Sequence, residues 1–262
     1  MRAINTIVTT AGRPDDESMV LAAFACQKLN APFEPRKKRS VRKISQELQA
    51  NVVVAGKNRY EYYAFGVQEP FFFHPNSAAF RLKRVARGEA EPFLQAAQLQ
   101  PGDAVLDCTL GLAADAMLAA YIVGETGRII GLEANPNVAF IVEQGTQSYD
   151  TTELPLTVCM RQIEVVQSEA VHYLKTLPDN SFDVVYMDPM FEEIIEEANN
   201  FQALRLAGEH VGLTDEWVHE AKRVARKRVV LKAHFRSEWF AKYHFRQYER
   251  GTAKFHYGVL EV

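Results

Sequence analysis

Four consecutive residues, Asp188-Pro189-Met190-Phe191, combine groups that could hold a flat ring carrying an amine. Such an amine is a poor nucleophile because its lone pair is delocalised into the ring, so its N–H groups need acceptors that aim the lone pair. Asp188 offers a carboxylate, and Pro189 fixes the chain so that a main-chain carbonyl can be the second acceptor. Phe191 offers a face for stacking an extruded base. At the end of a strand, this pattern favours chemistry on a base amine over an ordinary Asp-Pro turn.

An earlier turn holds a single glycine, Gly111, between Asp107 and Asp115. Ligands of doubly wound sheets bind at the carboxyl ends of strands, where glycine allows close backbone approach. A dinucleotide fingerprint needs three glycines, but alanine stands at 113 and 116, so an NAD site is disfavoured. A carboxylate such as Asp107 repels a pyrophosphate and attracts a sulfonium cation. The turn therefore indicates S-adenosylmethionine, while its plain alternative is a structural strand–helix corner.

Two more predicted strand ends carry polar residues. Glu133 ends the second strand, where an acid can accept hydrogen bonds from both ribose hydroxyls. Ser168 and Glu169 end the third strand, where a nucleoside base could be bracketed. The alternatives are a surface carboxylate near a helix start for Glu133, and helix capping by Ser168.

The elements that must position these residues alternate along the chain between β-rich and helical runs, which is typical of a parallel sheet with crossover helices. We expect strands at 104–107, 128–133, 163–167, 182–187 and 228–232, then a hairpin of 243–249 and 254–262. Helices are expected after Gly111, after the N-cap Asn135 and after the N-cap Thr214. The prediction for residues 93–262 is an α/β fold with a doubly wound, mostly parallel seven-stranded sheet.

Residues 1–92 predict a separate, small and basic α+β domain. Strands are expected at 4–9, 51–55 and 60–67, with helices at 16–29 and after Ser40. The aromatic run 71–74 is a further, weaker candidate for a base-stacking surface.

Charge is distributed unevenly along the 262 residues, whose net charge is −3. Residues 1–100 hold 15 Lys/Arg against 9 Asp/Glu (+6), residues 101–200 hold 3 against 17 (−14), and residues 201–262 hold 12 against 7 (+5). The cationic clusters at 36–43 and 222–228 could bind phosphates or could be solvated surface. We interpret the pattern as an acidic cofactor pocket flanked by two RNA-binding segments.

Other classes of protein are excluded or disfavoured. The composition is that of a globular protein rather than a disordered or fibrous one, and the longest apolar-looking stretch contains Asp107 and Asp115, which argues against a membrane span. No signal-type segment is found in the first 30 residues, so a cytoplasmic location is expected. Three cysteines without metal-type spacing predict neither a disulfide framework nor a metal site.

Several stretches together resemble a known family. They are Leu106-Asp107-Cys108-Thr109-Leu110-Gly111-Leu112, Ala114-Asp115-Ala116, Leu132-Glu133-Ala134-Asn135-Pro136, Asp188-Pro189-Met190-Phe191 and Lys227-Arg228-Val229-Val230-Leu231-Lys232. The chain resembles the class I S-adenosylmethionine-dependent methyltransferases, and within them the RsmJ-like guanine-N2 methyltransferases of small-subunit ribosomal RNA. The likeness covers roughly residues 70–262.

The resemblance implies S-adenosylmethionine as cofactor, with S-adenosylhomocysteine as product and no metal. It implies cofactor binding by the residues at four positions, which are Ala114 with Asp115, Glu133 with Ala134, Ser168 with Glu169, and Asp188. The family carries Arg where this chain has Ala114 and Ser where it has Glu169. We expect cofactor binding to persist despite these two differences, but the resemblance does not identify the target nucleotide.

These observations predict a methyltransferase acting on a nucleobase amine, with guanine N2 of ribosomal RNA as the first candidate target. Asp188, Pro189 and Phe191 are the predicted catalytic residues. Two alternatives stay open: a methyltransferase for a small molecule or protein, and a non-catalytic nucleic-acid-binding relative.

Overall fold

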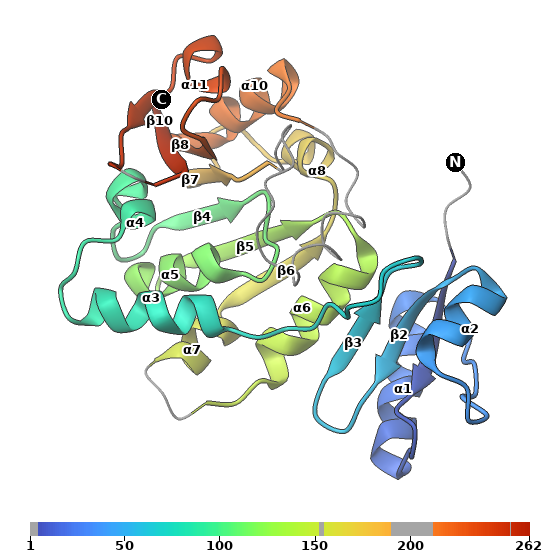
Figure 1. Cartoon of the computed structure of the whole chain (residues 1–262). Helices are drawn as coiled ribbons and strands as arrows, with labels where there is room; N and C mark the ends of the chain where they lie inside the picture. Colours follow the sequence, from blue (N-terminus) through green and yellow to red (C-terminus); the bar gives the residue numbers. More distant parts are fainter. Residues whose placement is uncertain (1–4, 152–154, 190–211, 252) are drawn as a thin grey trace. The chain divides into compact units, whose positions relative to one another are not determined.

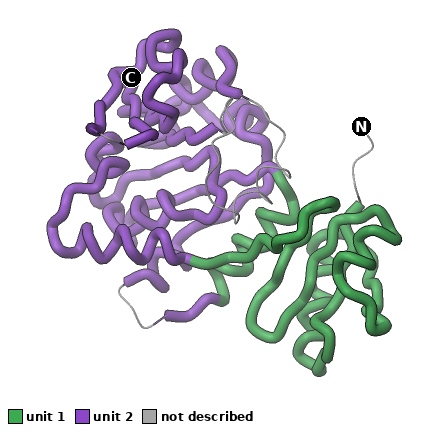
Figure 2. The backbone as a smooth tube through the Cα atoms, in the orientation of Figure 1, with its two compact units in different colours: residues 1–74, 135–148, 195–209 green, residues 75–134, 149–194, 210–262 purple. Residues whose placement is uncertain are grey.

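The computed structural model describes residues 5–151, 155–189, 212–251 and 253–262 and divides the chain into two compact units. Unit 1 contains residues 1–74 and 135–148, and unit 2 contains residues 75–134 and most of the chain after residue 148 (Figure 2). The first boundary lies at residue 74, whereas the sequence predicts a domain boundary near residue 92. A functional division into residues 1–92 and 93–262 stays a prediction.

Unit 2 is built on a seven-stranded sheet in the order β6-β5-β4-β7-β8-β10-β9 (Figure 1). Its strands are β4 Ala104–Asp107, β5 Arg128–Glu133, β6 Ile163–Gln167, β7 Phe182–Met187, β8 Ala225–His234, β9 Arg246–Tyr248 and β10 Phe255–Glu261. Strands β4 to β8 pair in parallel, and β10 runs antiparallel to both of its neighbours. The predicted mostly parallel seven-stranded sheet is confirmed.

Helices cover both faces of this sheet. They are α3 Asn76–Ala86, α4 Pro92–Ala97, α5 Ala114–Val123, α7 Leu156–Arg161, α8 Ala170–Thr176, α10 Asp215–Val224 and α11 Trp239–Lys242. Leu174, Trp217 and Phe240 from α8, α10 and α11 share one apolar core with the strands. Helices α3, α4, α5 and α7 gather on the other face (Figure 1). This two-sided cover is the doubly wound arrangement.

The chain order places a topological switch between β4 and β7. After β4 the chain builds β5 and β6 on one side of it, then returns to form β7 on the other side. In such sheets the crevice outside the carboxyl ends of the two strands at the switch is where ligands bind. Those ends are Asp107 on β4 and Met187 on β7, the residue before Asp188.

The described residues of unit 1 form a three-stranded sheet and three helices, so the small α+β fold is confirmed. Its elements are β1 Thr6–Thr10, α1 Asp16–Leu29, α2 Val41–Leu48, β2 Asn51–Ala55, β3 Tyr60–Tyr63 and α6 Pro136–Ser148. Strand β2 pairs in parallel with β1 and antiparallel with β3. Helix α6 begins after Asn135, whose side chain accepts hydrogen bonds from the N–H groups of Asn137 and Val138, as predicted.

Helix α6 belongs to unit 1, although the sequence predicts it within residues 93–262. Its Phe140 ring meets that of Tyr60 edge to face at 4.8 Å. At Gly145 the ring of Phe73 packs so closely that a Cβ atom would lie 2.1 Å from it. Aromatic contacts between segments about 80 residues apart leave no periodic signal along the chain, which is why the prediction missed this grouping.

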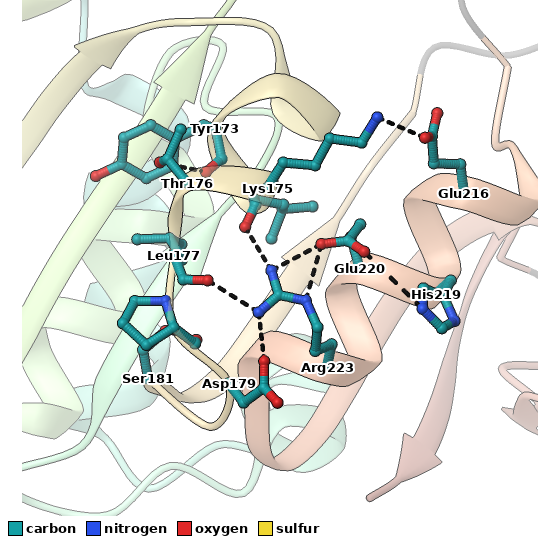
Figure 3. A network of polar contacts seen from close by, with 12 residues as sticks. Tyr173, Lys175, Thr176, Leu177, Asp179, Ser181, Glu216, His219, Glu220 and Arg223 are labelled. Atoms are coloured by element: carbon teal, nitrogen blue, oxygen red, sulfur yellow. Dashed lines mark hydrogen bonds and ion pairs between the residues drawn. The ribbon is translucent and has the colours of Figure 1, made fainter.

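The second cationic cluster is largely paired within unit 2. Four of its members contact carboxylates: Arg223 with Asp179 and Glu220, Arg226 with Asp183, Lys227 with Asp103 and Asp183, and Arg228 with Glu261. Arg223 also donates to the carbonyls of Leu174 and Leu177 at the carboxyl end of α8 (Figure 3). The expectation that this segment offers a free cationic surface for RNA is therefore not supported for these four side chains.

Arg223 should be a stability determinant of unit 2. Arg223→Met keeps much of the stem but removes the charged donor from two carbonyls and two carboxylates, so we expect the free energy of unfolding to fall by about 2 kcal/mol in urea denaturation. Lys222→Met, at an exposed neighbour on the same helix, is the control and should change it by less than about 0.5 kcal/mol. Equal losses in the two variants would contradict this role.

Candidate functional site

Two predicted site residues, Asp107 at the end of β4 and Asp188 directly after β7, are linked at the switch point through Thr109. The main-chain N–H of Thr109 donates to Asp107 Oδ1 at 3.0 Å. The hydroxyl of Thr109 accepts from the main-chain N–H of Asp188 at 2.8 Å. Thr109 therefore ties the end of β4 to the segment that follows β7, and it holds the backbone of Asp188 in place.

Asp188 has two unlike carboxylate oxygens. Its Oδ2 accepts a hydrogen bond from Lys232 Nζ of β8 at 2.6 Å. Its Oδ1 is buried and has no hydrogen-bond partner among the described residues. Burial raises the pKa of Asp188 above its usual value, and the Lys232 charge offsets part of that rise. One oxygen is thus fixed by a cation, while the other is a buried acceptor that lacks a partner among the described residues.

Lys232 stays charged despite its burial. Burial alone would lower the pKa of its ammonium group, but Asp188 and Asp115 outweigh that effect and hold the pKa above its usual value. It lies on the strand neighbouring β7, with Leu231 directly beside Met187 in the register. Lys232 ends one of the stretches that carry the family resemblance, but the sequence does not predict it as a site residue. The signal for it was a charge directly after the apolar run Val229–Leu231.

Asp115 sits in a second, adjoining network. Its Oδ2 accepts from the Tyr186 hydroxyl at 3.1 Å, and its Oδ1 lies 2.8 Å from an Arg81 nitrogen. Arg81 also pairs with Glu91 at 2.6 Å. Burial would raise the pKa of Asp115, but Lys232 and Arg81 hold it below its usual value. The protein itself thus satisfies much of this carboxylate, and no periodic feature of the sequence points to Arg81 or Tyr186 as its partners.

Asp107 differs from its neighbours because it forms no ion pair with a cation among the residues that the structure describes. Its side chain is 2% exposed, and burial raises its pKa to about 8, with Asp115 and Asp188 adding to the rise. At pH 7 it is mostly protonated. From the sequence, Asp107 is expected to be a carboxylate that attracts a cation, but burial disfavours that charge.

The turn after β4 leads into a helix after Gly111, as the sequence predicts, while the cofactor-binding role of its residues stays a prediction. Gly111 and Ala113 adopt left-handed backbone conformations, with φ of 50° and 60°, and α5 begins at Ala114. Leu110 packs against β5, where a Cβ atom at Gly131 would lie 2.3 Å from it. Gly111 and Ala114 are both partly exposed.

The ends of β5 and β6 lie side by side. Glu133 is half-buried, its carbonyl accepts from the N–H of Ser168 at 3.1 Å, and Ala134 is exposed. The cap of α8 is Glu169, which accepts from the N–H groups of Val171 and His172. The alternative that Ser168 caps this helix is therefore wrong. The Glu169 carboxylate reaches both N–H groups, while the Ser168 hydroxyl donates to the main-chain carbonyl of Glu169.

The sequence also predicts roles for Pro189, for Phe191 and for the aromatic run 71–74. Pro189 is buried, whereas Phe191 lies outside the described residues. Phe71 and Phe73 are buried at 3% and 5% exposure within unit 1, so neither offers a face for stacking. Within the described ranges, no cluster of three or more potential metal ligands is found and no helix is long and apolar enough to span a membrane.

The raised pKa of Asp107 predicts a pH-dependent stability. Between about pH 4 and 8 the unfolded chain has lost this proton while the folded chain keeps it, so the contribution of Asp107 to the free energy of unfolding falls as pH rises. Asp107→Asn cannot ionise, so its stability relative to the wild type should increase by more than about 1 kcal/mol between pH 5 and pH 8. Urea denaturation at both values checks this, with the exposed Asp16→Asn as control. A constant difference between wild type and Asp107→Asn would contradict it.

Comparisons with known proteins agree with this architecture. The chain is 43% identical to YpiP, an uncharacterised protein of Bacillus subtilis, over 98% of this chain and 99% of that protein. It is 30% identical to ribosomal RNA small subunit methyltransferase J of Coxiella burnetii and 31% identical to that of Nitrosococcus oceani. These matches cover 50% and 57% of this chain and 50% and 60% of those proteins.

A solved structure supports the fold. The SAM-dependent methyltransferase NGO1261 from Neisseria gonorrhoeae superposes with a TM-score of 0.57 at 17% identity, over 97% of this chain and 95% of that chain. The model of the family described as putative SAM-dependent methyltransferase matches residues 67–255. Because that match spans well over half of the chain, the protein belongs to this family of SAM-dependent methyltransferases.

Proposed function

We propose that the protein methylates an exocyclic amine of a nucleobase, with guanine N2 in ribosomal RNA as the target. The observation that carries the proposal is Asp188, which directly follows the switch-point strand β7 and has one oxygen held by Lys232 and the other buried and without a partner among the described residues. An acceptor held in this way can orient an amine. Pro189, which follows it, supplies no competing N–H.

The residues at the strand ends fit S-adenosylmethionine. The unused oxygen of Asp188 and the acid Glu133 are acceptors, which suits a ligand with two ribose hydroxyls and a cationic sulfur. We propose that Asp107, Gly111, Ala114, Asp115, Glu133, Ala134, Ser168, Glu169 and Asp188 surround the cofactor. When bound, it supplies an electrophilic methyl group and leaves as S-adenosylhomocysteine.

The protein's own part in the reaction is positioning. Asp188 and the carbonyl of Pro189 accept the N–H groups of the target amine and thereby direct its lone pair. Lys232 and the Thr109 hydroxyl fix Asp188 from two sides, so the acceptor does not reorient during transfer. Phe191 is proposed to stack the extruded base.

The RNA substrate is supported by the relatives and by unit 1. Two of the relatives above are named as methyltransferases of small-subunit ribosomal RNA. In unit 1 the side chains of Lys37, Lys38, Arg42 and Lys43 are exposed. Arg39 instead forms ion pairs with Glu34 and Glu47. Lys37 and Lys38 are therefore the proposed phosphate contacts, and Arg39 shapes the loop that carries them.

A second candidate is a methyltransferase for a small molecule or a protein. The internal pairing of Arg223, Arg226, Lys227 and Arg228 favours it, because such an enzyme needs no second cationic segment. Mass spectrometry of ribosomal RNA from cells with and without the gene distinguishes the two. The RNA proposal expects one methyl mark to be lost, and an unchanged set of marks would favour the second candidate.

Asp188→Asn should lower methyl transfer at least 100-fold, because one acceptor of the target amine becomes a mixed donor and acceptor and loses the pairing with Lys232. Calorimetric titration should show binding of S-adenosylmethionine weakened only moderately. Asp16→Asn, an exposed carboxylate of unit 1, serves as the control for activity. Unchanged turnover in Asp188→Asn would overturn the proposed mechanism.

The double variant Lys37→Gln, Lys38→Gln should weaken binding to small-subunit ribosomal RNA. Each lost phosphate contact lowers the slope of log affinity against log salt by about 0.7 to 0.9, so the slope should fall by roughly 1.5. Lys28→Gln with Lys57→Gln removes the same charge from other exposed positions of unit 1. If both double variants give the same salt slope, the loop makes no specific contact.

A further inference from the structure

One exposed aromatic ring lies at the carboxyl end of β8, three residues after Lys232. Phe235 is 38% exposed. Its ring centroid lies 4.6 Å from that of His234, and the Arg236 guanidinium lies 5.0 Å from the Phe235 centroid. The ring is thus flanked by a second aromatic ring and a cation, and it lies directly after a strand whose Lys232 contacts Asp188.

The backbone that carries this ring is held from both sides. The N–H of Phe235 donates to the carbonyl of Lys254 at 2.9 Å. The carbonyl of Phe235 accepts from Gln247 Nε2 at 2.9 Å, and the same amide nitrogen lies 2.9 Å from His256 Nδ1. Lys254, which directly precedes β10, and Gln247 of β9 therefore fix the main-chain position of Phe235. A ring held in this way loses little freedom when it binds a flat partner.

The surroundings fit a single flat partner better than an apolar protein surface. Among the described residues from 225 onward, the other exposed large apolar side chain is Val262, at the opposite end of β10. Phe235 is thus the exposed apolar ring at this end of the strand, beside the charge of Arg236 and the rings of His234 and His256, whose centroids lie 4.6 and 5.9 Å from its own. Unpaired nucleobases bind by stacking on aromatic rings and guanidinium planes, with the phosphates drawn by cations.

We infer that Phe235, with Arg236, forms a stacking platform for an unpaired nucleobase that flanks the methylated nucleotide. The inference rests on the proposed RNA methyltransferase function and adds a second contact with the substrate. Phe235 lies three positions after Lys232, which corresponds to about 10 Å of extended main chain. A strand of RNA whose target base is held at Asp188 can place a neighbouring nucleotide at that distance.

Phe235→Ala tests the platform on small-subunit ribosomal RNA transcribed in vitro, with transfer of a labelled methyl group as the readout. We expect the KM for RNA to rise about tenfold, with kcat and the affinity for S-adenosylmethionine changing less than twofold. Phe235→Tyr keeps a stacking face and should restore the KM. Phe80→Ala removes another exposed ring of unit 2, on α3, and should leave the KM unchanged.

The outcomes separate the platform from the proposed function. If the wild type methylates the transcript and Phe235→Ala has the same KM, the platform is wrong while the RNA function stands. A similar rise in KM for Phe235→Tyr, or for Phe80→Ala, would also overturn it. If the wild type methylates no RNA transcript, the proposed function fails and the platform fails with it. Thermal melting of each variant checks that the exposed substitutions leave the fold intact.

Discussion

The ion pair between Lys232 and Asp188 is the interaction on which the site depends. Three aspartates meet at the switch point, and carboxylates this close would repel one another without a cation. Lys232 contacts Asp188 and lowers the pKa of Asp115. Removing one partner of a buried pair leaves an uncompensated charge, which costs several kcal/mol. Lys232 therefore allows three acidic side chains to gather at the switch point between β4 and β7.

Internal ion pairs also explain much of the uneven charge along the chain. The sequence suggests a division of labour between an acidic middle third and cationic flanks. In the structure, Lys227 pairs with Asp103, Arg226 with Asp183, and Arg223 with Asp179. Much of the positive charge after residue 220 therefore compensates acids of the middle third within unit 2. The exposed lysines at positions 37 and 38 are different, because no carboxylate of the described chain contacts them in an ion pair.

Sequence patterns predicted the elements with strong local signals and missed those that depend on distant contacts. Strands β4, β5, β6 and β7 have the predicted bounds, since buried parallel strands are short apolar runs between clear turn signals. Helix α3 was missed: its polar sequence lacks a cap, and its Arg81 is held by Glu91 and Asp115. The sequence predicts Asp107, Glu133 and Asp188 as site residues because each ends a strand or directly follows one. Lys232 is not predicted, because its role appears only when β8 lies beside β7.

The electrostatic state of the site constrains what it can accept. The paired acids Asp188, Asp115 and Glu91 face the two cations Lys232 and Arg81, and Asp107 adds an acid that no ion pair of the described residues compensates. A cationic ligand reduces this excess of acidic groups, whereas an anionic ligand such as a dinucleotide increases it. S-adenosylmethionine carries a sulfonium, an ammonium and a carboxylate, which sum to +1. A cation near Asp107 would also favour its ionisation, because the pKa of about 8 is only slightly above neutral pH. The charges of the site thus favour a cationic ligand over an anionic one, in agreement with the cofactor of the family.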